Sequence, residues 1–308
     1  MKQSYFSATG NWYKGNLHTH STVTDGKQTP EERVNSYQQH GYSFLALTDH
    51  NILAAYPDLC SEDFIALAGV ERNISGPETA TPDHCIHIVG ISEREHTERV
   101  SQPLVKYPLL DLEQDGQMLL DEMISDGQLC IVAHPVWSRM TLRELSKLNG
   151  HVGIEVYNQT CDATNRTGHS DYLIDCCLRE GKQVYLFATD DCHSANPEHD
   201  MFGGWIVVKA DRLTQKDLLG QIKKGSFYAS TGPEIYDFGI DGQTMYIECS
   251  PCEHIHFITY ECRGKSVNQS GVTSATYQVK GNETFVRCEC VDSRGKIAYT
   301  NPVFVKGK

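Results

Sequence analysis

Two histidines and an aspartate in the first part of the chain have types and spacing suited to holding a metal ion. His18 and His20 lie in the segment NLHTH (16–20), and Asp25 follows in a loop that contains a glycine. Residues two apart in an extended segment point to the same side, so both imidazoles can reach one ion. A lone pair of this kind is common without a metal, so its meaning depends on the residues that accompany it.

Further candidate ligands occur at or near the ends of apolar runs. The carboxyl ends of strands form the face of a β/α barrel on which active sites are built, so we expect these side chains to meet. Of the adjacent Asp190 and Asp191, the Asp-x-His spacing favours Asp191. Zinc takes four ligands, so nine nitrogen and oxygen donors suit two or three divalent ions such as Zn, Mn or Fe. The candidates beyond the first three are His50, Glu71, His87, His134, Asp191 and His193.

The elements that must position these residues alternate between apolar runs and helix-patterned segments over residues 11–229. Thr29, Pro30 and Glu32 give a capping signature, and Gly41 ends the helix they begin. About seven strands with intervening helices predict a β/α barrel with a mostly parallel sheet. Strands are expected at 44–47, 64–70, 86–89, 129–133, 152–156, 184–188 and 205–208. Helices are expected at 30–40, 112–126, 141–148, 169–180 and 214–223.

The pattern changes after residues 232–233 to short alternating strands separated by glycine turns. This predicts two domains, a β/α barrel over 11–229 and a small all-β, sandwich-like domain over 233–308. His254 and His256 form a second His-x-His pair, which we interpret as solvent-facing. Four cysteines of the second domain are interpreted as small apolar core residues. They are Cys249, Cys252, Cys288 and Cys290.

Composition limits the partners that the chain can have. Its 308 residues include 27 basic and 40 acidic side chains, a formal charge of −13. Long nucleic acid is bound largely through Lys and Arg, so this balance disfavours it, whereas a small phosphorylated substrate is compatible. No apolar run is long enough to span a membrane, and the first residues do not resemble a signal peptide. We therefore expect a cytoplasmic protein with reduced thiols.

An ordered set of short motifs runs through the first two thirds of the chain: HTHSTVTDG (18–26), TPEE (29–32), GYSFLALTDHN (41–51), GVE (69–71), HIVG (87–90), AHP (133–135) and ATDDCH (188–193). This set resembles the polymerase and histidinol phosphatase (PHP) family of metal-dependent phosphoesterases. The segments GIEVYN (153–158), FYASTGP (227–233) and NPVFV (301–305) resemble a subgroup of that family with a β-rich C-terminal part.

The resemblance implies a distorted seven-stranded β/α barrel that holds a trinuclear metal site. It also implies a division of the ligands among three metals. His18, His20 and Asp191 match ligands of the first metal, with Glu71 as a bridge. His87 and His134 match ligands of the second metal, and Asp25, His50 and His193 match those of the third.

The chemistry favoured by such a site is hydrolysis. Coordination to divalent ions lowers the pKa of water toward neutrality and neutralises charge on a phosphoryl oxygen. With Glu71 between the ions, we expect a bridging hydroxide to act as the nucleophile. Asp25 and His193 are candidates for protonating the leaving group.

Three residues are candidates for binding a phosphate substrate. A guanidinium matches phosphate well, and Arg72 and Arg139 lie close in sequence to Glu71 and His134. Each could instead be a surface or ion-paired arginine. Asn158 follows a predicted strand and could bind substrate or cap a loop. Asp49 is expected to orient a metal-bound imidazole.

The leading hypothesis is hydrolysis of a small phosphate monoester or diester, such as a nucleotide, a cyclic phosphate or a sugar phosphate. A second hypothesis keeps the metals and changes the bond to a carboxylic ester or carbamate, because the same nucleophile attacks acyl carbon. A third is a metal-stabilised binding module without activity. The sequence does not indicate an oligomeric state.

Overall fold

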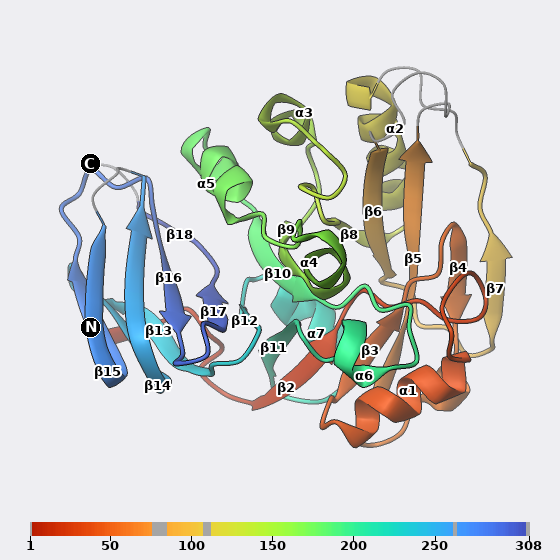
Figure 1. The fold of residues 1–308 in the computed structure, drawn as a ribbon, viewed down its shortest axis with the longest axis horizontal. Helices are drawn as coiled ribbons and strands as arrows, with labels where there is room; N and C mark the ends of the chain where they lie inside the picture. The colour runs from red at the N-terminus through yellow and green to blue at the C-terminus, as the bar shows by residue number, and fades with distance from the viewer. Residues whose placement is uncertain (1, 76–84, 107–111, 261–263, 306–308) are drawn as a thin grey trace.

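The computed structural model describes residues 2–75, 85–106, 112–260 and 264–305. None of the helices in these segments is long and apolar enough to cross a membrane. Figure 1 shows the larger, helix-containing part of the chain beside a part made of strands alone.

The larger part is built on a mixed sheet of eight strands. Four neighbouring pairs are parallel, and β6 and β11 run antiparallel to their neighbours. Within the described residues β10 and β11 do not pair, so the hydrogen bonding does not reproduce a closed seven-stranded barrel. In hydrogen-bonded order the strands are β10 (Tyr185–Thr189), β9 (Gly153–Asn158), β8 (Gln128–Val132), β6 (Cys85–Ser92), β5 (Ile65–Ser75), β3 (Phe44–Leu47), β2 (Asn11–Asn16) and β11 (Trp205–Ala210).

The helices of this part begin where the sequence provides caps. Thr29 and Glu32 form the predicted capping box of α1, and Thr141 and Glu144 form a second one at α3. The helices are α1 (Pro30–Gln39), α2 (Leu112–Ser125), α3 (Leu142–Lys147), α4 (Gln159–Asn165), α5 (Asp171–Arg179), α6 (Pro197–Asp200) and α7 (Gln215–Ile222). Short additional elements are β1 (Lys2–Ser4), β4 (Ile52–Ala55), the 3-10 helix Pro57–Leu59, β7 (Val100–Pro103) and β12 (Phe227–Ser230).

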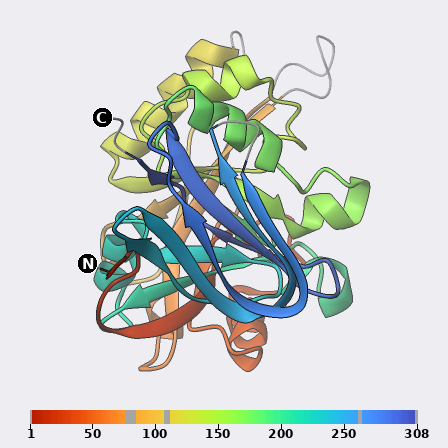
Figure 2. The same cartoon turned by 90° about the vertical axis from the view of Figure 1, so that its left-hand side faces the viewer.

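The remaining strands form the predicted all-β part, which we call the tail. Its longest strand, β14, bends at register shifts between Glu248 and His254. The half before the bend pairs with β13, and the half after it pairs with β16, as the curved strands in Figure 2 illustrate. The tail strands are β13 (Ile235–Asp241), β14 (Thr244–Thr259), β15 (Lys265–Gln278), β16 (Phe285–Val291), β17 (Ile297–Thr300) and β18 (Val303–Phe304).

The tail is connected to the larger part by strand pairing and by buried side chains. β12 pairs with β17, and β1 pairs with β13. The Asn301 side chain accepts from the Leu186 backbone at 2.9 Å and donates to the Gly225 and Phe227 carbonyls. Buried Arg287 donates two bonds, of 2.7 and 2.9 Å, to Asp175 of α5. The two predicted domains therefore share one continuous hydrogen-bonded sheet.

Candidate metal centre

The predicted ligands all lie at one end of the central strands. His18 and His20 follow β2, and His50 follows β3. His134 follows β8, while Asp191 and His193 follow β10. Asp25 lies in the loop between β2 and α1, and the remaining two are inside strands, Glu71 on β5 and His87 on the adjacent β6. Residues from six separate segments therefore meet at this end of the sheet.

Glu71 lies at the centre of the cluster and is 1% exposed. Its two oxygens face different imidazoles, which is the arrangement expected of a carboxylate that bridges ions. Around Oε1 lie His87 Nδ1 at 2.8 Å, His134 Nε2 at 3.1 Å and His18 Nε2 at 3.3 Å. Around Oε2 lie His50 Nδ1 at 2.9 Å and His20 Nε2 at 3.4 Å.

Asp191 completes one four-residue group with Glu71. Its Oδ1 lies 2.9 Å from His20 Nε2 and 3.1 Å from His18 Nε2. One ligand atom from each of these four buried residues lies within 4.8 Å of the others. The group therefore has enough donor atoms, close enough together, to bind one four-coordinate ion.

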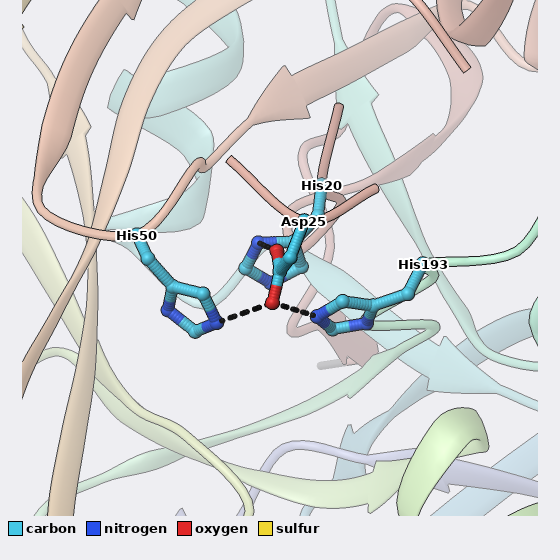
Figure 3. Close-up of side chains that lie close together, drawn as sticks. All are labelled: His20, Asp25, His50 and His193. Carbon is cyan, nitrogen blue, oxygen red and sulfur yellow. Dashed lines mark ion pairs between the residues drawn. The ribbon is translucent and has the colours of Figure 1, made fainter. Parts of the chain in front are cut away.

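A second group lies around Asp25 on the more open side of the cluster. Figure 3 shows the Asp25 carboxylate between two imidazoles, with Oδ2 3.5 Å from His50 Nε2 and 3.5 Å from His193 Nε2. His20 belongs to this group as well, through Nδ1 at 3.8 Å from Asp25 Oδ1. Asp25 is exposed, so this side is reachable from solvent.

A third group contains His50, Glu71 and His87. His134 adjoins it through Glu71 and lies 3.7 Å from Asp191 Oδ2. The nine residues predicted as ligands therefore form one cluster with Glu71 shared between groups. His20 and His50 each belong to two groups. The family resemblance had given each of them to a single metal.

Two ligand positions have left-handed backbone conformations. Asp191 has φ of 54° and His134 has φ of 26°, both unusual for residues with a Cβ. The Asp191 amide donates to the His18 carbonyl at 2.8 Å, which fixes the turn after β10 beside the segment after β2. Such conformations persist where surrounding structure imposes them, and they often occur at functional sites.

Several buried atoms at the cluster make the close contacts given above, but within the described residues none of these contacts has hydrogen-bond geometry. They include His18 Nε2, His20 Nδ1, His50 Nδ1 and Glu71 Oε2. Each such atom costs about 1–3 kcal/mol if it is left unsatisfied. Coordination of divalent ions would satisfy them, so these nitrogen and oxygen donors fit the group that the sequence indicates.

The charges of the cluster shift its pKa values strongly. Burial lowers the pKa of His20 to about 4. Burial also disfavours the charged form of His50, but Glu71 and Asp25 outweigh it and raise the pKa of His50 to about 10. Burial alone would raise the pKa of Glu71, yet His87, His18 and His50 hold it well below its usual range. Bound cations would take over this role from protons on the imidazoles.

Glu155 is a buried carboxylate beside the cluster that the sequence did not reveal. Its Oε1 accepts from His18 Nδ1 at 2.7 Å and from the Thr189 hydroxyl at 2.7 Å. Its Oε2 accepts from the His134 backbone at 2.8 Å. Glu155 therefore orients one ligand and the turn that carries another. The available signal was an acidic residue inside the apolar run VGIEV (152–156).

Asp49 was expected to orient a metal-bound imidazole, but its partners are Ser21 and Thr24. Its carboxylate accepts from the Ser21 amide at 2.8 Å, the Ser21 hydroxyl at 2.7 Å and the Thr24 hydroxyl at 2.8 Å. Asp49 therefore holds the loop that presents Asp25. Asp190, the alternative to Asp191, accepts from the Tyr37 hydroxyl at 2.6 Å and from three backbone amides of residues 202–204. This places Asp190 outside the cluster, to which Asp191 belongs.

The candidate substrate residues are placed very differently from one another. Asn158 is fully buried, caps α4 through the Cys161 amide and donates to Glu155 Oε2 at 2.9 Å. It therefore positions other groups. Arg72 lies on the face of β5 opposite Glu71 and donates to Glu122 Oε1 at 3.0 Å, which argues against a substrate role. Arg139 is exposed five residues after His134 and stays a candidate.

The second His-x-His pair and four cysteines of the tail lie away from the cluster. His254 and His256 pair with Asn268 and Ser266 on β15. Cys249, Cys252, Cys288 and Cys290 are at most 1% exposed and pack in the apolar core of the tail, as expected.

Comparison with known proteins gives a short sequence match and a full-length structural match. No protein-family model matches the chain. A segment of 79 residues, 25% of the chain, is 39% identical to the 5'-3' exoribonuclease Rnm of Salmonella typhimurium and, equally, of Escherichia coli. The match spans 26% of the length of each of these curated relatives.

The structural match covers both parts of the molecule. A two-domain protein of Bacteroides vulgatus, described as containing a predicted PHP-like metal-dependent phosphoesterase, superimposes with a TM-score of 0.50 over 98% of both chains at 15% identity. An amidohydrolase of Chromobacterium violaceum is similar over 60% of this chain and 89% of its own, with a TM-score of 0.40 and 18% identity. The resemblance to PHP-like phosphoesterases expected from the motifs is therefore confirmed at the level of the fold.

Proposed function

We propose that this protein is a metal-dependent phosphoesterase that hydrolyses a small phosphate monoester or diester. The observation that supports this most strongly is the nine-residue cluster around Glu71, because it joins donors for more than one divalent ion in one solvent-reachable site. Bound divalent ions would activate water and neutralise phosphoryl charge. The PHP-like fold supports the same class of chemistry.

The residues of the chain have separate tasks in this proposal. Glu71 holds imidazoles on both of its oxygens, so it would keep the two inner groups at a fixed separation. Asp25 and His193 lie on the open side, where a leaving group would need a proton. Arg139 would contribute positive charge to an incoming phosphate.

A second candidate function is removal of nucleotides from the end of an RNA. The 79-residue match to an enzyme named as a 5'-3' exoribonuclease favours it. The charge of −13 argues for short oligonucleotides over long polymers. Both candidates break a phosphoester bond, and they differ in the size of the group on the far side of that bond.

The test is turnover by the purified chain loaded with Zn, Mn or Fe and assayed for metal content. Substrates would be nucleoside monophosphates, a cyclic nucleotide, a sugar phosphate, a short 5'-phosphorylated RNA, and an aryl ester and a carbamate of similar size. We expect phosphoester hydrolysis that Glu71→Gln reduces by at least about 100-fold, since that change removes the central anionic ligand. Faster turnover of the ester or carbamate would favour the acyl alternative. A metal-loaded chain inactive on every substrate would contradict the proposal.

A further inference from the structure

A cavity of about 480 Å³ lies where the central sheet meets the tail. It shares no lining residue with the metal cluster. Its walls come from β2, β11, β12, the turn between α1 and β3, and the segment leading into β13. Figure 1 shows β11 and β12 on the side of the larger part that faces the tail. Small-molecule sites occupy about 300–1,000 Å³, so the cavity has the size of a ligand site. Its chemically distinctive lining residues are Trp12, Lys14, Trp205, Tyr228, Glu234 and Tyr236.

The walls of this cavity are aromatic. Trp12 packs edge-to-face on Tyr228, with ring centroids 5.6 Å apart, and Phe6 packs behind Trp12 at 4.9 Å. Tyr236 is 51% exposed, and its hydroxyl donates to Glu234 Oε2 at 3.0 Å. These contacts hold ring surfaces at the cavity, where a planar ring could stack.

Lys14 supplies a positive charge that no carboxylate of the described residues contacts directly. Its Nζ lies 3.9 Å from the centroid of the Trp205 ring and 4.1 Å from that of Tyr42. Within the described residues it makes no hydrogen bond or ion pair. Glu234 also lines the cavity, but its carboxylate accepts from the Tyr236 hydroxyl, and within the described residues it makes no ion pair with Lys14. Burial lowers the pKa of Lys14 to about 8, and the charge of Asp190 acts in the opposite direction but is outweighed.

We propose that this cavity, the Lys14 pocket, binds a small planar aromatic anion, whose negative group pairs with Lys14 while its ring stacks on the aromatic walls. An aromatic carboxylate and a nucleotide both have this chemistry. A neutral ring would leave the ammonium without a counter-ion, and an aliphatic anion would leave the ring surfaces uncovered. The proposal is independent of the proposed function, because none of its residues belongs to the metal cluster.

Equilibrium binding to the full chain, freed of metal by chelation, tests the proposal. The probe is 2-naphthoate, followed by tryptophan fluorescence and by calorimetry. Two matched probes separate its features, because 2-naphthamide keeps the rings without the charge and cyclohexanecarboxylate keeps the charge without a planar ring. We expect 2-naphthoate to bind about 10-fold or more tightly than either. AMP measured against adenosine distinguishes a phosphate from a carboxylate ligand.

Variants locate the binding. Lys14→Met keeps most of the apolar stem and should weaken 2-naphthoate binding about 10-fold, whereas Lys14→Arg should retain it. Tyr236→Ala, at an exposed ring, should weaken it about 3-fold or more and tests the pocket independently of Lys14. Thermal melting checks that each variant folds.

Three results would overturn the proposal. One is equal affinity of the wild-type chain for 2-naphthoate and 2-naphthamide, which needs no variant. Another is unchanged affinity in folded Lys14→Met and Tyr236→Ala. The third is binding that His87→Ala abolishes and the Lys14 variants do not, since that would assign the anion to the metal cluster.

Discussion

The residues that form the candidate metal cluster could be proposed from the sequence because their types are rare and their positions are regular. Imidazoles and carboxylates at strand ends, such as His134 after an apolar run, have few structural uses there. The groups that hold the ligands were harder to assign. Glu155 lies inside a strand and contacts His18 and His134 only after folding. Asn158 and Asp49 were recognised, but their partners depend on loop geometry that the sequence pattern does not contain.

Glu155 should matter for metal binding although it is not a ligand. We expect Glu155→Gln to lower metal affinity or activity by about 10–100-fold, because the amide no longer fixes the His18 imidazole by a charged hydrogen bond. Metal content after dialysis against a weak chelator measures the effect. Glu180→Gln, at an exposed position after α5, is the matched control. Equal metal retention in both variants would show that Glu155 serves only to stabilise the fold.

Lys14 should make the stability of the chain depend on pH. Its pKa is about 8 in the folded chain and near 10.5 when unfolded, so the unfolded chain binds more protons between these values. The free energy of unfolding should therefore rise with pH across this window. Relative to Lys14→Met, we expect a gain on the order of 1 kcal/mol, after allowing for solvent screening of a half-buried group. Urea unfolding of the wild-type chain and of Lys14→Met at pH 7.5 and 10.5 measures this gain. The same change in unfolding free energy with pH in both proteins would show that Lys14 is not its source.

At the scale of elements, capped helices and apolar strands were well predicted. The helix expected at 30–40 is α1, with its capping box formed, and the run at 184–188 corresponds to β10. Short elements such as α6 and β7 were missed, because four residues give neither a period nor a continuous apolar run. The antiparallel direction of β6 was also beyond the pattern, because direction is set by connections and tertiary packing.

The joint between β10 and the tail should depend on one side chain. Asn301 bonds with the backbone of Leu186, Gly225 and Phe227, and its replacement by alanine leaves these buried groups unsatisfied. We expect Asn301→Ala to lower the free energy of unfolding by about 2–4 kcal/mol, measured by urea denaturation. The control is Asn268→Ala, which removes an exposed tail bond to His254. Equal losses of unfolding free energy in the two variants would show that Asn301 contributes no more to stability than an exposed side chain does.

At the scale of the whole molecule, the helices of the described residues all precede residue 232, where the sequence pattern changes. The continuity of the sheet across that point was not predictable, because pairs such as β12 with β17 join residues far apart in the sequence. The placement of the Lys14 pocket depends on the same long-range pairing.

Metal removal should destabilise the whole chain. The cluster draws side chains from six segments, so ions that bind only the folded form would hold all of them together. We expect the metal-loaded protein to melt about 5 °C or more above the chelated protein, in a scan that follows tryptophan fluorescence. Glu71→Gln should reduce that difference. Identical melting temperatures with and without metal would contradict the assignment of the cluster as a metal centre.

The pairing of β1 with β13 also constrains how the chain acquires its structure. Ser4 lies opposite Gly239, so β1 leaves the ribosome long before its partner is made. At about 5–20 residues per second, the wait lasts tens of seconds. Until then β1 is a free strand, and β13 afterwards has an open edge that β1 must reach before another molecule does. The arrival of β13 therefore sets the earliest moment at which this edge of the tail can be closed.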